Sequence, residues 1–119
     1  MGAVYMARHV KLKRVVALKV LLKNRLGNPE ALARFEREME AVGRLDHPHI
    51  VRAHDARRLG ETHFLVMEFI QGPDWEHLVR RFGPLRVADV CELGRQAALG
   101  LQYAHANGVI HRDIKPSNL

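Results

Sequence analysis

Two side chains late in the sequence have the types and spacing that phosphate chemistry requires. Asp113 and Asn118 lie five residues apart in the segment 111–118, which begins His111-Arg112-Asp113. Phosphoryl transfer from ATP uses a carboxylate that receives a hydroxyl proton and an amide oxygen that holds Mg²⁺. Four residues fixed at this spacing occur by chance in roughly one chain of this length in a thousand. The segment is therefore a strong candidate for a catalytic loop.

A second candidate is a cation inside an apolar strand. Lys19 lies within residues 15–22, a run that is apolar on both faces and rich in β-branched side chains. Burying a charge is costly unless the charge is paired. One interpretation is that the aliphatic stem carries the ammonium group out to water. The sharper interpretation requires a partner carboxylate and an anionic ligand.

A helix expected over residues 29–44 supplies a possible partner for Lys19. At 100° per residue, Glu36 and Glu40 point away from the apolar stripe, whereas Glu38 falls within it. Glu38 would then face the sheet that holds Lys19, and the pair would aim the ammonium group at a phosphate. Alternatively, a tilted helix leaves Glu38 in solvent. The stripe itself consists of Ala31, Leu32, Phe35, Met39 and Val42.

The elements that must position these residues follow an α+β order. We expect four strands, over residues 3–10, 15–22, 51–59 and 62–69. Asn28 caps the helix of residues 29–44, whose first residue is Pro29, and His47-Pro48 follows its end. This order predicts a small antiparallel sheet that carries one helix, followed by a helical part.

The helical part begins after a linker at Gln71-Gly72-Pro73, which divides the chain into expected domains of residues 1–71 and 72–119. A short helix is expected over residues 75–81 and a long one over residues 86–107, which Gly108 ends. The apolar stripe of the long helix consists of Val87, Val90, Gly94, Ala97, Leu101 and Ala104.

Composition limits the classes of function. The 119 residues carry a formal charge of +6, but the basic residues look spread along the chain and do not alternate with aromatic side chains. We therefore expect no nucleic-acid partner. The sequence shows no signal peptide and no apolar run long enough for a membrane span. The single cysteine, Cys91, fits the reducing cytoplasm, where we expect the protein to be located.

Taken together, these segments resemble the bacterial, eukaryotic-like (Hanks-type) serine/threonine protein kinases over nearly the whole chain. Residues 1–7 look like the end of the glycine-rich loop, and residues 16–19 look like the strand that carries the phosphate-binding lysine. Residues 35–38 resemble the helix that carries its glutamate partner, and residues 47–51 the segment after that helix. Residues 111–118 resemble the catalytic loop in its serine/threonine form.

The resemblance implies roles for individual residues in a kinase that uses ATP and Mg²⁺. Asp113 would be the catalytic base, Lys115 would touch the γ-phosphate, and Asn118 would bind Mg²⁺. Lys19 would contact the α- and β-phosphates and pair with Glu38. The nucleotide would also be held by Gly2, Val4, Ala17, Met67, Glu68 and Ile70, with Gly2 as the last glycine of the loop, Val4 over the adenine ring, Met67 as the gatekeeper and residues 68–70 as the hinge. Arg112 favours a protein substrate, and Lys115, two residues after Asp113, favours phosphorylation on Ser or Thr.

Several family segments have no counterpart in these 119 residues. The missing segments are the first strand with two glycines, the Asp-Phe-Gly metal site, the activation loop, the Ala-Pro-Glu segment and the helices after them. We therefore expect a fragment or a frame that starts upstream of Met1, and doubtful activity of the isolated chain. The alternatives are a nucleotide-binding fragment without turnover, a truncation product without function, and, last, a basic nucleic-acid binder.

Overall fold

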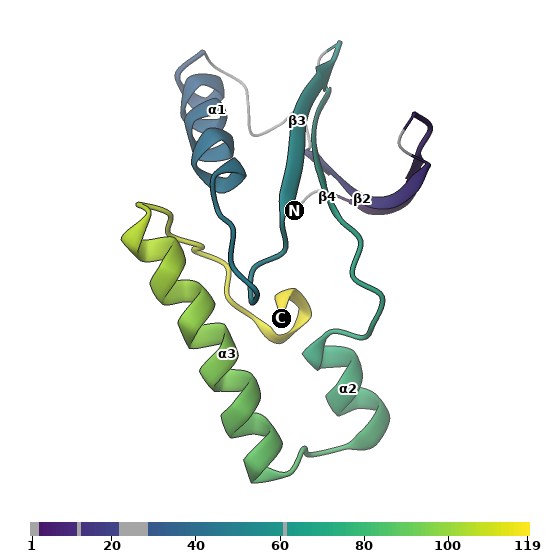
Figure 1. Ribbon diagram of the computed structural model, residues 1–119, viewed down its shortest axis with the longest axis vertical. Coiled ribbons are helices and arrows are strands. Elements are labelled where there is room, and N and C mark those ends of the chain that lie inside the picture. Colours follow the sequence, from purple (N-terminus) through teal and green to yellow (C-terminus); the bar gives the residue numbers. More distant parts are fainter. Residues whose placement is uncertain (1–2, 12, 22–28, 61) are drawn as a thin grey trace. The chain divides into compact units, whose positions relative to one another are not determined.

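The computed structural model describes residues 3–11, 13–21, 29–60 and 62–119. The predictions for Gly2, Leu22, Asn28 and Glu61 therefore lie outside the described residues. The chain divides into two compact units (Figure 1). The first contains the described residues up to Asp46 together with Val51–Ile70, and the second contains His47–Ile50 together with Gln71–Leu119.

The first unit is built on a four-stranded antiparallel sheet with the order β1-β2-β4-β3. The strands are β1 (Val4–His9), β2 (Arg14–Leu21), β3 (Ala53–Leu59) and β4 (Thr62–Glu68). The apolar run that predicted the second strand forms β2, an inner strand with a neighbour on each edge. The expected α+β order is confirmed, and β3 starts two residues later than predicted.

The core of the first unit lies on the two inner strands. Val16 of β2 and Leu65 and Val66 of β4 are buried, together with Leu45, which follows helix α1 (Pro29–Gly43). Each such side chain stabilises the fold by about 1.5–3 kcal/mol when it leaves water. His63 of β4 is also buried. Burial of the inner strands therefore holds β2 and β4 together.

A bulge interrupts the pairing of β3 with β4. Ala53 is opposite Met67 and Asp55 is opposite Val66, so His54 is the extra residue. After the bulge the pairing is regular. On the N-terminal side of the bulge, Glu68 binds the residue before β3. Its backbone nitrogen donates to the Arg52 carbonyl oxygen at 2.9 Å, and its Oε1 accepts from the Arg52 backbone nitrogen at 2.8 Å.

The second unit contains helices α2 (Trp75–Phe82) and α3 (Val87–Ala106) and a short 3₁₀ turn, η2 (Pro116–Asn118). Both helices match their predicted ranges to within one residue at each end. Helix α3 stops before Gly108, whose φ of 77° lies in the left-handed region that glycine adopts without strain. Among the described helices, even the 20-residue α3 is not apolar enough over its length to cross a bilayer.

Of the predicted α3 stripe, only Ala104 is buried. Ala97 and Leu101 are half-buried, whereas Val87 and Val90 are 80% and 48% exposed; Gly100, which is not part of the stripe, is also buried. The N-terminal part of the stripe is therefore exposed in this structure. The reason is that the turn at His47–Ile50 packs on the second half of the helix, close to Gly100.

The contact between this turn and α3 requires a residue without a side chain. A Cβ atom on Gly100 would lie 2.9 Å from the carbonyl oxygen of His49 and 3.4 Å from Cγ1 of Ile50. The His47 ring also packs on Tyr103 with a centroid separation of 5.1 Å, and its Nδ1 accepts from the His49 backbone nitrogen at 3.1 Å. The turn is thus held by backbone and ring contacts at one site.

This contact predicts opposite effects of one substitution at two glycines of the same helix. Nothing lies within 4 Å of a Cβ atom built on Gly94, so Gly94→Ala should stabilise the chain by about 0.5–1 kcal/mol through helix propensity. Gly100→Ala makes the same change in propensity but pushes on the His49 carbonyl, and we expect a lower melting temperature than for the unsubstituted chain. Thermal unfolding followed by circular dichroism measures both, and equal stabilisation by the two substitutions would contradict the packing described here.

Candidate active site

Four of the predicted nucleotide-binding residues share one face of the sheet. Val4 is directly opposite Lys19, and Ala17 is directly opposite Met67. Residues that face each other across antiparallel strands point to the same side, as do residues two apart in one strand. Lys19 and Ala17 are two apart in β2, so all four side chains lie on the same face. Lys19 is half-buried there and Val4 is exposed.

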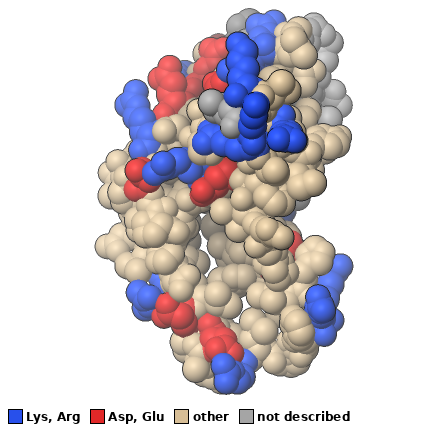
Figure 2. Space-filling model, turned by 45° about the vertical axis from the view of Figure 1, so that its right-hand side comes forward, with Lys and Arg blue, Asp and Glu red and all other residues tan. Residues whose placement is uncertain are grey.

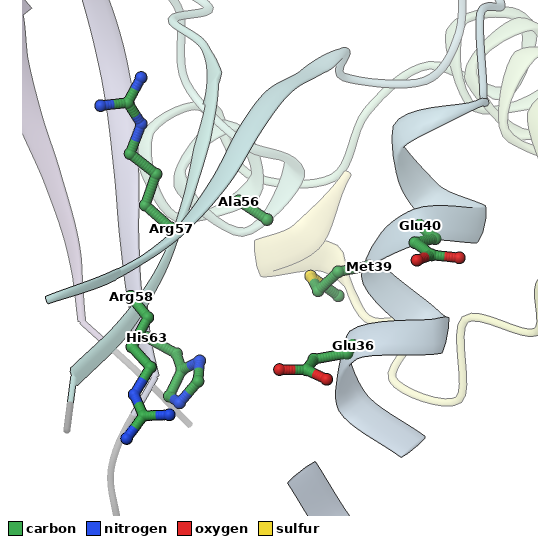
Figure 3. Close-up of a pocket in the computed structure, with 7 residues that line it drawn as sticks. All are labelled: Glu36, Met39, Glu40, Ala56, Arg57, Arg58 and His63. Atoms are coloured by element: carbon green, nitrogen blue, oxygen red, sulfur yellow. The ribbon is translucent and has the colours of Figure 1, made fainter. Parts of the chain in front are cut away.

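Helix α1 lies against this same face where it meets β3 and β4. A pocket of about 340 Å³ separates them, and its residues are labelled in Figure 3: Glu36, Met39, Glu40, Ala56, Arg57, Arg58 and His63. His63 is opposite Leu21, two residues beyond Lys19 in β2, and is therefore on the Lys19 side of the sheet. The helix predicted to carry the partner of Lys19 thus covers the correct face.

The glutamates of α1 all have exposed side chains. Glu36 and Glu40, expected to point away from the apolar stripe, flank Met39 in the wall of the pocket (Figure 3). Glu38, expected inside the stripe, has an exposed side chain. Met39, a member of the predicted stripe, is half-buried in the wall of the pocket, and the exposure of Glu38 matches the alternative in which the helix leaves this residue in solvent. The pairing of Glu38 with Lys19 stays a prediction.

The predicted hinge begins where β4 ends. Glu68 is the last residue of β4, and its side chain is held by the backbone of Arg52. Ile70 lies beyond the strand and is 59% exposed. The Glu68 side chain therefore has a structural role at the start of β3, while the backbone of residues 69–70 continues outside the ladder.

The predicted catalytic loop brings its three charged or amide side chains together. Nζ of Lys115 lies 3.1 Å from Oδ2 of Asp113. Nδ2 of Asn118 donates to the Asp113 carbonyl oxygen at 2.8 Å and lies 3.2 Å from Oδ2 of the same residue. The five-residue separation in sequence thus closes into a ring of contacts around one carboxylate.

The backbone on the other side of Asp113 is also held. His111 accepts a hydrogen bond from the Asp113 backbone nitrogen through Nδ1, at 3.2 Å. Between them Arg112 has a φ of 62°, a left-handed conformation that costs a residue with a Cβ atom roughly 1–2 kcal/mol. The strained backbone at Arg112 therefore allows His111 to reach the backbone of Asp113, and such strain is typical of functional loops.

The charges in this loop keep the aspartate ionised. The hydrogen bond from Lys115 is the largest cause of a lowered pKa of Asp113, and Asn118 and His111 lower it further. The Asp113 side chain is half exposed, so this effect shows the protonation state and adds little to stability. At neutral pH the carboxylate can accept a hydrogen bond or a proton from an approaching hydroxyl.

Asn118 has an oxygen atom that could serve as a ligand for a hard metal ion. Its amide nitrogen is used by Asp113, and its amide oxygen makes no hydrogen bond to the part of the chain that the structure describes. Amide and carboxylate oxygens are suitable Mg²⁺ ligands, and Mg²⁺ commonly takes its other ligands from phosphates and water. No group of three or more His, Cys, Asp or Glu side chains that could hold a metal occurs in the described ranges.

The end of the catalytic loop is attached to α2 by residues that the sequence analysis did not select. The Trp75 backbone nitrogen, the first of α2, donates to the carbonyl oxygen of Leu119 at 3.0 Å. Asp74 caps the same helix end by accepting from the His77 nitrogen at 2.8 Å, and His77 Nδ1 lies 2.9 Å from both carboxylate oxygens. An aspartate directly before a helical pattern is an N-cap signal that could have identified Asp74.

Known proteins are similar to this chain in sequence and in fold. A family model described as protein kinase domain matches residues 1–119. The serine/threonine-protein kinase PknD of Mycobacterium tuberculosis is 42% identical over 119 residues, and PrkC of Bacillus subtilis is 34% identical over 119 residues. Each alignment covers 100% of this chain and 18% of the relative. The chain thus spans less than a fifth of the length of these relatives.

Solved kinase structures show the same fold. The crystal structure of the M. tuberculosis PknI kinase domain matches with a TM-score of 0.87 and 37% identity, over 99% of this chain and 48% of that one. Rad53 residues 1–466 in complex with AMP-PNP match with a TM-score of 0.87 and 30% identity, over 98% of this chain and 30% of that one. The fold is that of a kinase N-terminal lobe followed by the start of the C-terminal lobe. This chain belongs to the protein kinase domain family.

Proposed function

We propose that this chain is the nucleotide-binding part and catalytic loop of a serine/threonine protein kinase, and that it serves transfer of the γ-phosphoryl group of ATP to Ser or Thr of a protein. The observation that carries the proposal is the contact of Lys115 and Asn118 with Asp113 on one loop. Relatives named serine/threonine-protein kinases support the choice of substrate. The reaction needs ATP, which the predicted cytoplasmic location supplies.

In this proposal Asp113 accepts the proton of the substrate hydroxyl as its oxygen attacks the phosphoryl group. Lys115 has two effects, because its ammonium group keeps Asp113 ionised and carries positive charge toward the γ-phosphate. His111 and Asn118 hold the backbone of Asp113 from both sides, and Asn118 also contacts its carboxylate. The loop then acts mainly through positioning and electrostatics.

The nucleotide would be held by the shared face of the sheet. We propose that Val4, Ala17 and Met67 contact the adenine ring, since they form a small apolar surface on the face that also carries Lys19. Lys19 would contact the α- and β-phosphates, with Glu38 of α1 as its partner. The proposal also includes Gly2 at the glycine-rich loop and the backbone of Glu68 and Ile70 at the hinge. These remain assignments by family resemblance.

Magnesium would be held by Asn118 and by the phosphates of ATP. The uncommitted amide oxygen of Asn118 fits this role. When bound, the ion neutralises charge on the phosphates. The residues of this chain supply the ligand, the base and the phosphate-binding cations around it.

Removing the base should abolish turnover while leaving the fold intact. In a complete kinase domain that contains this chain, Asp113→Asn keeps the size of the side chain but cannot accept the proton, and we expect a loss of about a hundredfold or more in kcat. Transfer of labelled phosphate to a generic protein substrate measures it. Asp89→Asn, a matched change at an exposed aspartate of α3, serves as the control. Normal turnover of the Asp113 variant would refute the assignment of the base.

Removing the ammonium group should change the protonation of Asp113. Lys115→Met takes away the hydrogen bond and the positive charge that lower the pKa of Asp113, so this pKa should rise toward its ordinary value. Folding lowers the pKa of Asp113. The ionised carboxylate that Lys115 favours is therefore fully present at pH values above the pKa of the unfolded chain, and it is lost as the pH falls through the pKa of the folded chain. Titration of the carboxyl carbon by NMR measures the shift, and Arg95→Met, which removes a distant cation, should leave it unchanged. An unaltered Asp113 titration in the Lys115 variant would count against this electrostatic role.

Nucleotide binding should stabilise the chain through Lys19. At a hundredfold excess over Kd, ATP with Mg²⁺ adds about 2.7 kcal/mol to the free energy of unfolding, so the melting temperature should rise by several degrees. Lys19→Met should abolish this increase, whereas Lys11→Met, the same change at an exposed lysine, should preserve it. Differential scanning fluorimetry provides the measurement. Full stabilisation of the Lys19 variant by ATP would exclude its phosphate contact.

A further inference from the structure

The positive charge of the chain is concentrated before its first carboxylate. Seven of the 19 Lys and Arg residues precede Glu30, and none of the 13 Asp and Glu residues does. The later part of the chain carries 12 basic and 13 acidic residues. Basic residues occur along the whole chain, but residues 1–29 carry a charge of +7 and the rest of the chain carries −1, so the net positive charge comes from residues 1–29.

Four of these cations meet at the turn between β1 and β2. Arg8 is opposite Val15 and His9 is opposite Arg14, so the two strands close at this end of the hairpin. We call Arg8, Val10, Lys11, Lys13 and Arg14 the basic tip, and all five side chains are exposed. Val10 is 84% exposed, the highest value among the large apolar side chains that the structure describes. The tip thus combines positive charge with an apolar apex.

In the part of the chain that the structure describes, no carboxylate forms an ion pair with the cations of the tip. Six basic residues elsewhere form ion pairs, namely Arg52–Asp46, Arg57–Asp55, Arg80–Glu76, Arg86–Asp89, Arg95–Glu92 and Lys115–Asp113. Within the described ranges, the four cations of the tip form no such pair. Figure 2 shows a cluster of Lys and Arg side chains in the upper part of this face, with Asp and Glu side chains beside it. The tip therefore presents uncompensated charge to a partner.

We infer that the basic tip docks this chain on the surface of a membrane that contains anionic phospholipids. Lys and Arg side chains bind lipid phosphates, and each one near such a surface contributes about 1 kcal/mol. Val10 would enter the boundary between headgroups and acyl chains, where an apolar side chain is favoured. In the sequence Leu12 continues the alternation of apolar and basic residues, although its position lies outside the described part of the chain.

The chemistry of the tip favours a membrane over a nucleic acid. Recognition of single strands uses aromatic rings on which bases stack, and base reading uses amide or guanidinium groups directed at base edges. The apex of the tip is instead an exposed valine between cations, which a polynucleotide would leave in water. A lipid interface satisfies both the charges and the apolar apex.

Docking at the tip would leave the nucleotide-binding residues accessible. Arg14 and Lys19 are five residues apart in β2, which corresponds to roughly 17 Å along the strand. Val4, opposite Lys19, is at the far end of β1 from the turn. The inference therefore stands independently of the proposed kinase activity, and it adds a location for the chain at a lipid surface.

Sedimentation of the 119-residue chain with vesicles tests the docking. We expect binding to vesicles of equal parts phosphatidylcholine and phosphatidylglycerol, no binding to phosphatidylcholine alone, and weakening with added salt. Lys11→Gln with Lys13→Gln should weaken binding by roughly 25-fold, about fivefold for each cation. The control is Arg44→Gln with Arg81→Gln, which removes the same charge at exposed positions outside the tip and should have little effect. Equal losses in the two double variants would overturn the inference, because binding would then follow net charge alone.

Val10 provides a second test that leaves the charge unchanged. Val10→Ser should reduce binding to the anionic vesicles severalfold, and Val10→Leu should preserve it, while circular dichroism verifies that both variants fold. Retention of full affinity by Val10→Ser would contradict insertion of the apex. A titration with duplex DNA under the same salt conditions completes the test. Tight DNA binding through Lys11 and Lys13, without vesicle binding, would refute the membrane as the partner.

Discussion

The arrangement of the nucleotide-binding face depends on the register of β2 with its two neighbours. Lys19 lies between Val4 of β1 and Leu65 of β4, and Ala17 lies between Met6 and Met67. A slip of one residue in either ladder would move the side chains of a strand to the opposite face. Val16 and Val66 are buried on the face opposite Lys19, so a slip of β2 would move the charge of Lys19 into apolar surroundings, which is costly. The core thereby determines which side chains can meet a ligand.

The catalytic loop depends on a different kind of constraint. Its side chains are mostly exposed, so packing contributes little to its conformation. Asp113 is instead positioned by hydrogen bonds, by one ion pair and by the left-handed conformation of Arg112. Short-range polar contacts allow the groups to be oriented while they stay accessible to a substrate. They add little to stability, since exposed pairs are weak, but they reduce the reorganisation needed when charge develops during a reaction.

Sequence patterns predicted the elements well and the contacts between them less well. Periodicity and the signals at Pro29 and Gly108 placed strands and helices to within one or two residues, and the spacing of Asp113, Lys115 and Asn118 predicted their meeting on one loop. These features are local. The buried face of α1, the exposure of Val87 and the approach of His49 to Gly100 depend on which surface packs against which. These features depend on contacts between segments that are distant in sequence. Patterns within a short segment of a single sequence do not reveal such contacts.

The bulge at His54 has a consequence for changes in chain length. Since His54 is the extra residue between Ala53 and Asp55, it absorbs one residue without altering the faces of Ala56 and Arg58. Deletion of His54 would join Ala53 directly to Asp55, which already pair with the neighbouring residues Met67 and Val66 of β4. Loss of any residue from the regular part of β3 would instead reverse the sides of the residues that follow. The strand that borders the α1 pocket therefore contains a position where a one-residue deletion leaves the pocket wall on the same face, and this tolerance arises from the pairing of β3 with β4.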